Sequence, residues 1–217
     1  MKYIKKGEEP ESLTAWKALA NEDWTPSYDL LSGREKTDVY NALLQEQGFI
    51  CCYCGMRITR ETCHIEHLKP RSTHPHLALE YRNMLASCQG ESETPPPKPV
   101  HCGHKKGEWY DENLMVSPIE ANCADFFKYT GSGEIQPTDD PDKQAAAKET
   151  IESLGLNINK LQRMRRKAID KILIGIEDCT NEEIQQLAVR YDRPDAEGKY
   201  TPFCGAIVYI LKHYFFP

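Results

Sequence analysis

The amino-acid sequence predicts an α+β fold, in which a small module framed by cysteines is embedded in a mainly helical scaffold. Most of the chain has apolar residues at helical spacing, but a cysteine-rich stretch and a short alternating segment interrupt this pattern at 51–69. With 217 residues, 40% of them apolar, the chain can bury a core of its own. We expect an N-terminal helical segment at 1–48, the cysteine-framed module at 49–130 and a C-terminal helical region at 131–217.

The overall charge and the cysteine count narrow the class of protein. A net charge of −6 argues against non-specific binding of the whole surface to nucleic acid, although a local basic groove is compatible with this charge. No signal peptide is visible at the start, and the longest apolar run, Phe203 to Leu211, is about half of what a membrane span needs. The nine cysteines, an odd number, therefore favour metal ligands and buried thiols over disulfides in a cytoplasmic protein that does not enter a membrane.

Two helices are expected before the module. Leu13, Trp16 and Leu19 recur at helical spacing, and a second helix spans 38–47 before Gly48 ends it. Both patterns are typical of ordinary core helices. Residues 49–59 should then form a short hairpin whose turn holds the first cysteines.

The first cysteines, in Cys51-Cys52-Tyr53-Cys54-Gly55, form a pattern typical of a zinc knuckle. In such a turn two thiolates converge on one ion, and the glycine relieves the backbone after the second ligand. Cys52 and Cys54 are too close in sequence to share this role easily, so we choose Cys51 with Cys54. A redox-active Cys-x-x-Cys would need a thioredoxin-like βαβ setting, which the sequence lacks.

A second cysteine pair is needed to complete a four-thiolate site, and Cys88 and Cys102 are the candidates. Between them lie the proline-rich residues 94–99, which are expected to form a stiff extended loop. Because this insertion splits the usual short knuckle, Cys63 remains open as a substitute ligand. Unrelated buried thiols are the alternative to a metal site.

An acidic residue beside a histidine lies between the two cysteine pairs. Alternation predicts a strand at 64–69, with His64 and Glu66 on one face and His67 on the other. A second strand is expected at 83–87. Phosphodiester cleavage needs a base for the attacking water and a divalent ion to take up charge on the phosphate and the leaving oxygen. A carboxylate beside a histidine, here Glu66 and His67, can supply a ligand for the ion and a base for the water.

Three other chemistries are excluded, one by the order of its motifs and two because their motifs are absent. Zinc deaminases also contain His-x-Glu, but their Pro-Cys-x-x-Cys follows it, whereas here the Cys-x-x-Cys comes first. The His-Glu-x-x-His of metalloproteases and the phosphate-binding Gly-Lys-Ser/Thr loop are both absent. Residues 101–107 should enter a short helix, in which His104 is either a metal ligand or a surface histidine.

The chain becomes mainly helical after the module. The helix expected at 157–178, capped by Asn157, has an apolar face and a basic side that is either solvated or follows phosphates beside the cleft. The last helix, at 203–216, is apolar nearly all round, so it either packs into the domain or docks on another protein. The basic side carries Arg163, Arg165, Arg166, Lys167 and Lys171. Other expected elements are a short helix at 117–129, turns at 131–133 and 137–141, and helices at 142–153 and from 180 onward.

Four motifs together resemble those of the HNH, or ββα-metal, endonucleases. They are Cys-x-Tyr-Cys-Gly at 51–55, Ile-Glu-His-x-x-Pro-x-Ser at 65–72, Tyr-x-Asn-Met at 81–84 and Cys-Gly-x-Lys-Lys-Gly at 102–107. More narrowly, the sequence resembles the PtuB proteins of Septu and retron-linked anti-phage defence systems. This resemblance implies a zinc-stapled ββα-metal nuclease module within the helical scaffold.

The resemblance also implies a role for each matched residue. His67 would be the general base, Glu66 would bind a catalytic Mg²⁺ or Mn²⁺, and Asn83 would fix the loop that orients His67. Many HNH enzymes place a metal-binding histidine directly after the final cysteine, where this chain has Gly103, so His104 is the candidate second ligand. Zinc would be held by Cys51, Cys54, Cys88 and Cys102, and nucleic acid would be bound by Lys69, Arg71, Lys105 and Lys106.

The same resemblance implies partners and a biological setting. A PtuB-like protein would work with a PtuA-like ATPase, and in retron-linked systems also with a reverse transcriptase and its RNA–DNA product. The nuclease would be the toxic effector, acting on DNA or on RNA, including tRNA. The alternative is a non-catalytic zinc-stabilised adaptor or nucleic-acid-binding subunit, in which the Glu66–His67 pair is structural.

Overall fold

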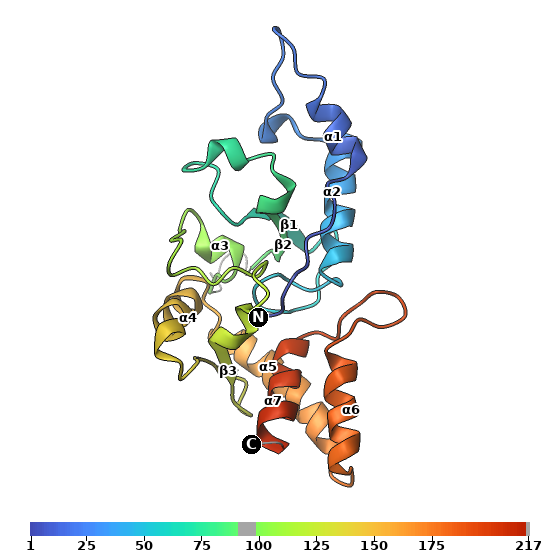
Figure 1. The fold of residues 1–217 in the computed structure, drawn as a ribbon, viewed down its shortest axis with the longest axis vertical. Coiled ribbons are helices and arrows are strands. Elements are labelled where there is room, and N and C mark those ends of the chain that lie inside the picture. Colours follow the sequence, from blue (N-terminus) through green and yellow to red (C-terminus); the bar gives the residue numbers. More distant parts are fainter. Residues whose placement is uncertain (91–98, 216–217) are drawn as a thin grey trace.

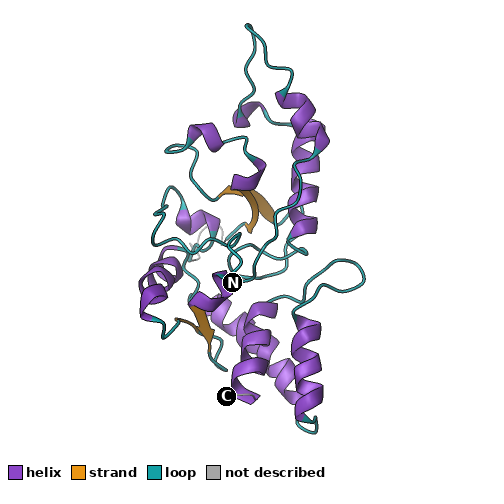
Figure 2. Cartoon of the chain, in the orientation of Figure 1, coloured by secondary structure: helices purple, strands orange, loops and turns teal. Residues whose placement is uncertain are grey.

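The computed structural model describes residues 1–90 and 99–215, which form mostly helices and two small antiparallel sheets (Figures 1 and 2). The expected α+β fold, mainly helical with small sheets, is confirmed at this level. The helices are α1 (Glu11–Lys17), α2 (Gly33–Glu46), α3 (Gly103–Lys106), α4 (Pro141–Ser153), α5 (Asn159–Ile174), α6 (Asn181–Tyr191) and α7 (Cys204–Phe215). The strands are β1 (Cys63–His67), β2 (Met84–Cys88), β3 (Phe127–Tyr129) and β4 (Ile135–Pro137).

Helix α2 supports the central hairpin, β1–β2. It begins earlier than the sequence predicted and buries Val39 and Leu43, and the chain leaves it through Gly48 at a positive φ of 56°. The buried amide of Gln47 then exchanges two hydrogen bonds with the backbone of Ala86 in β2, at 2.7 and 2.8 Å. The end of α2 is therefore fixed to the strand that carries Cys88.

The hairpin β1–β2 has an antiparallel register in which Glu66 lies opposite Leu85 and His67 opposite Met84. The strand β2 matches the predicted one to within one residue, whereas β1 begins one residue and ends two residues before the predicted bounds. The knuckle before β1 contains one isolated bridge, Ile50–Arg57, in place of the expected paired strands. Helices α2 and α3 lie on opposite sides of the hairpin (Figure 1). Most of the proline-rich loop expected at 94–99 falls outside the described residues.

The second sheet, β3–β4, corrects the helix predicted at 117–129. Only a single 3₁₀ turn forms there, at Cys123–Phe126, because the next residues alternate with period two: Phe127 and Tyr129 are buried and Lys128 between them is not. The strand therefore pairs with β4. Gly133 in the connecting turn has a φ of +86°, and a Cβ there would lie 2.2 Å from the Gln162 carbonyl oxygen of α5.

Helix α5 departs from the prediction at two residues. Asn157 does not cap it; its side chain pairs with both backbone groups of Ile135 in β4, at 2.7 and 3.0 Å. Arg165, expected on the basic side, is only 2% exposed and donates to the carbonyl oxygens of Gly133 and Leu156. The basic residues that stay exposed on α5 are Arg163, Arg166, Lys167 and Lys171.

The C-terminal helices α6 and α7 pack on each other and on α5. Thr180 begins α6 with a capping box, as its sequence predicts. Of the two alternatives for the last helix, the structure favours packing into the domain, because most of its described apolar side chains are buried in the chain's own core, whereas Tyr214 is 56% exposed. The buried ones are Phe203, Ile207, Val208, Ile210 and Leu211.

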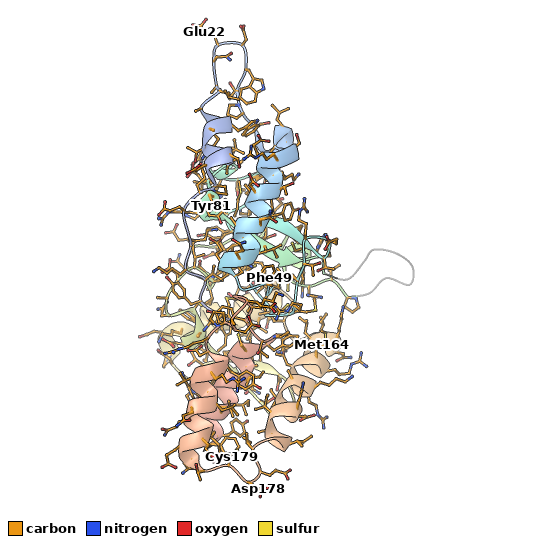
Figure 3. The ribbon with its side chains drawn as sticks, turned by 90° about the vertical axis from the view of Figure 1, so that its right-hand side faces the viewer. Glu22, Phe49, Tyr81, Met164, Asp178 and Cys179 are labelled. Carbon is orange, nitrogen blue, oxygen red and sulfur yellow. The ribbon has the colours of Figure 1, made fainter. Side chains whose placement is uncertain are left out.

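The molecule is elongated, with the central hairpin between two helical ends. Glu22 lies at one end, on the loop after α1, and Asp178 and Cys179 lie at the other, between α5 and α6 (Figure 3). Within residues 1–90 and 99–215, no helix is long and apolar enough to cross a membrane.

Candidate active site

Four cysteine thiols converge next to the β1–β2 hairpin. Cys51 and Cys54 come from the knuckle turn, Cys88 ends β2, and Cys102 directly precedes α3. All four are buried, and their Sγ atoms lie within 4.8 Å of one another. Thiolates about 2.3 Å from a zinc ion in a tetrahedron are separated by about 3.8 Å, and the Sγ atoms of Cys54 and Cys88 are 3.9 Å apart. The donor set therefore fits a structural zinc ion.

The surroundings lower the pKa of two thiols of the cluster, Cys51 and Cys88, and raise the pKa of the other two, Cys54 and Cys102. Burial alone would raise the pKa of Cys51, but hydrogen bonds from the neighbouring thiols outweigh burial and hold this pKa well below its usual range. The backbone N–H of Cys88 donates to the Cys51 Sγ at 3.3 Å. His101, fully buried, places its Nδ1 3.1 Å from the Cys102 Sγ. Because zinc binds thiolates, this local chemistry agrees with a metal site.

The remaining nearby cysteines stay outside the cluster. The Sγ of Cys63 faces the Arg60 carbonyl at 4.0 Å, and burial raises the pKa of this thiol to about 11. Burial also raises the pKa of Cys52. The structure thus brings together the four cysteines that the sequence singled out, and it does not use Cys63 as the substitute.

Glu66 projects from β1 toward α3 and is almost completely buried. Its Oε1 receives the Lys106 ammonium at 2.9 Å and the Tyr53 hydroxyl at 3.2 Å, while its Oε2 lies 3.4 Å from the His64 Nε2. Burial alone would raise the pKa of Glu66, but His64 and Lys106 outweigh it and hold the pKa below its ordinary value. The carboxylate is therefore an anion at neutral pH, as a metal ligand must be.

His67 ends β1 and has a defined tautomer. Its Nε2 lies 2.9 Å from the carbonyl oxygen of Ala78. Because a carbonyl only accepts, Nε2 carries the proton and Nδ1 keeps its lone pair. Burial lowers the pKa of His67, so the imidazole is neutral at neutral pH. The ring of Tyr28 packs edge-on against it, with centroids 4.6 Å apart.

Asn83 holds the loop that orients His67. Its Oδ1 accepts from the Lys69 backbone N–H at 2.8 Å, and its Nδ2 donates to the carbonyl oxygens of Lys69 and Leu77 at 3.0 and 3.2 Å. Leu77 directly precedes Ala78, whose carbonyl receives the His67 proton. The side chain of Asn83 thereby joins both ends of the loop between the two strands.

Of the four basic residues expected to bind nucleic acid, Lys106 is buried. It is 3% exposed, and its ammonium contacts Glu66 and the His67 carbonyl oxygen, so it does not present its charge to a ligand outside the protein. Arg71 is exposed, stacks on Tyr28 and pairs with Asp29 at 2.9 Å. Lys69 is partly buried and Lys105 is exposed.

His64 joins the site without having been assigned a role from the sequence. The strand alternation already put it on the face of Glu66, which was the available signal. His104 is exposed and lies edge-on to the His64 ring, with centroids 4.6 Å apart. The residue of α3 that directly faces Glu66 and His64 is Gly103, where an added Cβ would lie 2.4 Å from the Glu66 Oε2 and 2.6 Å from the His64 Nε2.

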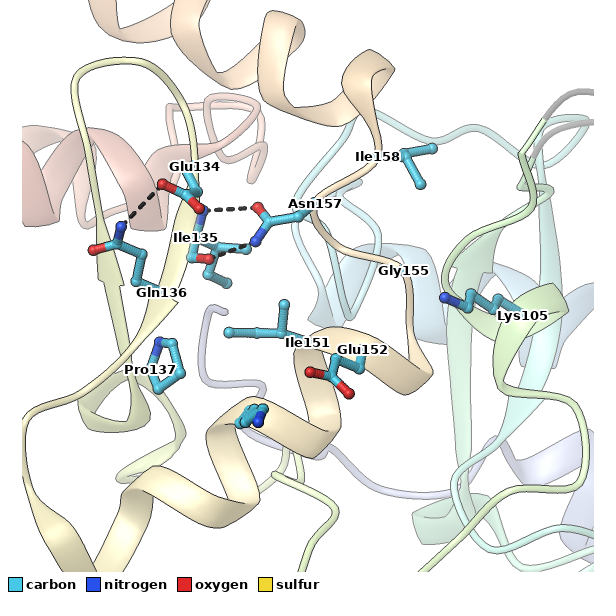
Figure 4. Close-up of a pocket in the computed structure, with 11 residues that line it drawn as sticks. Lys105, Glu134, Ile135, Gln136, Pro137, Ile151, Glu152, Gly155, Asn157 and Ile158 are labelled. Carbon is cyan, nitrogen blue, oxygen red and sulfur yellow. Dashed lines mark hydrogen bonds between the residues drawn. The ribbon is translucent and has the colours of Figure 1, made fainter.

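A pocket of about 370 Å³ lies beside α3, away from Glu66 and His67 (Figure 4). Lys105 borders it on one side and Ile135 of β4 on the other, with Ile151 of α4 between them. Its lining mixes charged, polar and aliphatic side chains, and neither Glu66, His67 nor one of the four clustered cysteines belongs to it.

Comparison with known proteins gives three homologues. The chain is 28% identical over 171 residues to the protein named "Retron Vc95 putative HNH endonuclease" of Vibrio cholerae serotype O1 biovar El Tor, covering 76% of this chain and 75% of the relative. It is 27% identical over 222 residues to "Retron Ec83 putative HNH endonuclease" of Escherichia coli, covering 84% and 83%. The third is "Septu protein PtuB" of Bacillus thuringiensis, 24% identical over 199 residues, covering 88% and 67%.

No model of a known protein family matches the chain. The three homologues nevertheless cover most of its length, and their names agree with the resemblance that the four sequence motifs predicted. That resemblance, to retron and Septu proteins of the HNH type, is confirmed.

Proposed function

We propose that this chain is a metal-dependent endonuclease of HNH type, which hydrolyses phosphodiester bonds in nucleic acid. The observation that carries the proposal is the pairing of Glu66 with His67 at the end of β1. One supplies an ionised carboxylate, and the other a neutral imidazole whose Nδ1 keeps a lone pair. Homologues named as HNH endonucleases support the same reaction class.

In this mechanism His67 removes a proton from the attacking water through Nδ1 while Nε2 stays bonded to Ala78. Asn83 keeps that carbonyl in place through the loop. Glu66 would hold a Mg²⁺ or Mn²⁺ ion, which when bound stabilises the charge on the phosphate and on the leaving oxygen. The four cysteines would hold a structural zinc ion that fixes the hairpin against α3.

We further propose that the nuclease is the toxic effector of an anti-phage defence system. The support is its homology to two retron proteins and to a Septu protein. In such a system it would act with a PtuA-like ATPase, and in a retron-linked setting with a reverse transcriptase and its RNA–DNA product. Its substrate would be DNA or RNA, including tRNA, because a ββα site acts on the phosphate and not on the sugar.

One observation favours the non-catalytic alternative. The Lys106 ammonium already neutralises Glu66 inside the protein, which is the arrangement of a structural ion pair. An adaptor, however, has no need for a neutral histidine with an unprotonated Nδ1 next to that pair. The nuclease would cleave nucleic acid and the adaptor would not, so a cleavage assay distinguishes the two functions.

The test is cleavage of labelled DNA and total cellular RNA by the purified protein, alone and with a PtuA-like ATPase. Each reaction is run with Mg²⁺, with Mn²⁺ and with a chelator that spares the zinc. We expect cleavage of one nucleic acid that requires the divalent ion. Intact DNA and RNA in every reaction, with folded and zinc-loaded protein, would favour the adaptor.

A further inference from the structure

We propose that His64, from the same strand as Glu66, is the second protein ligand of the catalytic divalent ion. This inference rests on the proposed nuclease function and names the ligand that α3 does not supply. The juxtaposition that carries it is the open face shared by the Glu66 Oε2 and the His64 Nε2, opposite Gly103.

The two carboxylate oxygens of Glu66 have different surroundings. Oε1 is occupied by two protein donors, Lys106 at 2.9 Å and Tyr53 at 3.2 Å. Oε2 lies 3.4 Å from the His64 Nε2, a separation too long for a strong charge-assisted hydrogen bond. An ion bound by Glu66 would therefore approach Oε2, and the nearest second donor on that side is the His64 Nε2.

The separation of these two atoms suits a shared ion. Adjacent ligands of an octahedral ion with bonds of about 2.1 Å lie about 3.0 Å apart. The observed 3.4 Å needs a shift of only a few tenths of an ångström. A carboxylate oxygen and an imidazole nitrogen are also a donor pair that Mn²⁺ accepts, whereas the soft thiolate cluster selects zinc.

Gly103 keeps this face open. Any side chain there would place its Cβ 2.4 Å from the Glu66 Oε2 and 2.6 Å from the His64 Nε2, so it would press on both atoms. The backbone of α3 thus approaches the two donors closely without supplying a ligand itself. His104, the next residue, is exposed and lies edge-on against the His64 ring.

The experiment measures Mn²⁺ coordination directly in zinc-loaded protein containing ¹⁵N-histidine. Pulsed electron paramagnetic resonance detects a directly bound nitrogen as ¹⁵N modulation of the Mn²⁺ signal, and titration of the free Mn²⁺ signal gives the affinity. We expect the wild type to show ¹⁵N modulation. His64→Gln should lose the modulation and bind Mn²⁺ at least about tenfold more weakly. Even the loss of a residue that only hydrogen-bonds to a metal ligand lowers metal affinity by about 10–100-fold.

Three further variants make the result decisive. Gly103→Ala should weaken Mn²⁺ binding, because its Cβ would press on both donor atoms; zinc content and circular dichroism check that this variant is folded. Glu66→Gln should weaken it as well. His213→Gln, an exposed histidine on α7, is the matched control and should leave the modulation unchanged.

Retention of the ¹⁵N modulation in His64→Gln, or its absence from the wild type, would overturn the inference. Loss of the modulation in His104→Gln with retention in His64→Gln would assign the ligand to His104 and also overturn it. If cleavage still requires a divalent ion, Glu66 and His67 in these cases, the proposed nuclease function stands although His64 is not a ligand. Failure of the ligand assignment is thereby distinguished from failure of the proposed function.

Discussion

At the residue scale, the chemistry depends on which nitrogen of His67 carries the proton. The Ala78 carbonyl takes the Nε2 proton, so Nδ1 is the basic atom, and burial keeps the ring neutral. Asn83 binds the loop that presents this carbonyl through Lys69 and Leu77. In the proposed mechanism, the base and its positioning residue are therefore linked through the neighbouring carbonyl groups of Leu77 and Ala78.

Asn83→Ala should lower kcat by about 10²-fold, because small misplacements of a catalytic group have effects of this size. KM and the Mn²⁺ affinity should stay within about twofold, since Asn83 touches neither the ion nor Glu66. Steady-state kinetics and Mn²⁺ titration check this. Asn113→Ala, at an exposed asparagine, is the control, and a kcat that stays at the wild-type value would remove Asn83 from the mechanism.

The ion pair between Lys106 and Glu66 gives a second prediction at this scale. Lys106→Met keeps the length of the side chain but leaves the buried carboxylate without its cation, which should cost about 3–5 kcal/mol of folding stability. Added Mn²⁺ should raise the Tm of this variant more than that of the wild type, because the ion supplies the missing positive charge. An equal shift in both proteins would argue against an ion at Glu66.

At the element scale, one helix holds the second sheet in place. Arg165 of α5 donates to the carbonyl of Gly133 in the β3–β4 turn and to that of Leu156 before the helix. Burial lowers the pKa of this guanidinium. A third acceptor is the Asn157 Oδ1 at 3.2 Å, so the side chain connects α5 with the β3–β4 turn and with the segment after α4.

Arg165→Met should therefore destabilise the protein by about 2–3 kcal/mol, because two buried carbonyl groups lose their donor. Urea unfolding of zinc-loaded protein measures this change. The neighbouring Arg166 is exposed and forms an exposed ion pair with Asp170 at 3.4 Å, so Arg166→Met should change stability by less than about 0.5 kcal/mol. Equal effects of the two substitutions would contradict the connector role.

Local patterns in the sequence predicted the central elements but not their tertiary partners. Alternation at 64–69 and the cysteine spacing indicated β1 and the knuckle, because both signals are encoded in neighbouring residues. The burial of the Arg165 side chain could not be predicted from the α5 sequence alone, since its acceptors lie in the β3–β4 turn and in the segment after α4. The same holds for Lys106 and His64, whose environment depends on how closely Gly103 approaches β1.

At the scale of the whole molecule, the cysteine cluster joins segments that are far apart in sequence. Cys51 precedes β1, Cys88 ends β2 and Cys102 precedes α3, so one ion would tie together the three parts of the ββα unit. The main core cluster extends from the N-terminal residues to α7. The zinc ion would therefore stabilise the centre of an elongated molecule whose two helical ends pack against it.

We expect about one zinc ion per chain that resists mild chelation, as four-thiolate sites do. Cys51→Ser should yield aggregated or unfolded protein, whereas Cys179→Ser, outside the cluster and only partly buried, should fold normally. Elemental analysis and circular dichroism check both variants. Folded, active protein without zinc would contradict the assignment of the four cysteines.

Whether His67 is the general base is decided by the cleavage rate of His67→Ala. Loss of the general base should lower the rate by about 10²–10⁴-fold, while zinc content and Mn²⁺ affinity remain close to the wild-type values. His213→Ala, purified in the same way, controls for contaminating nucleases and should retain full activity. A near wild-type rate in His67→Ala would contradict the proposed mechanism, because hydrolysis would then proceed without the base. Loss of that rate in a double variant, Glu66→Gln with His67→Ala, would show that the remaining activity belongs to this site.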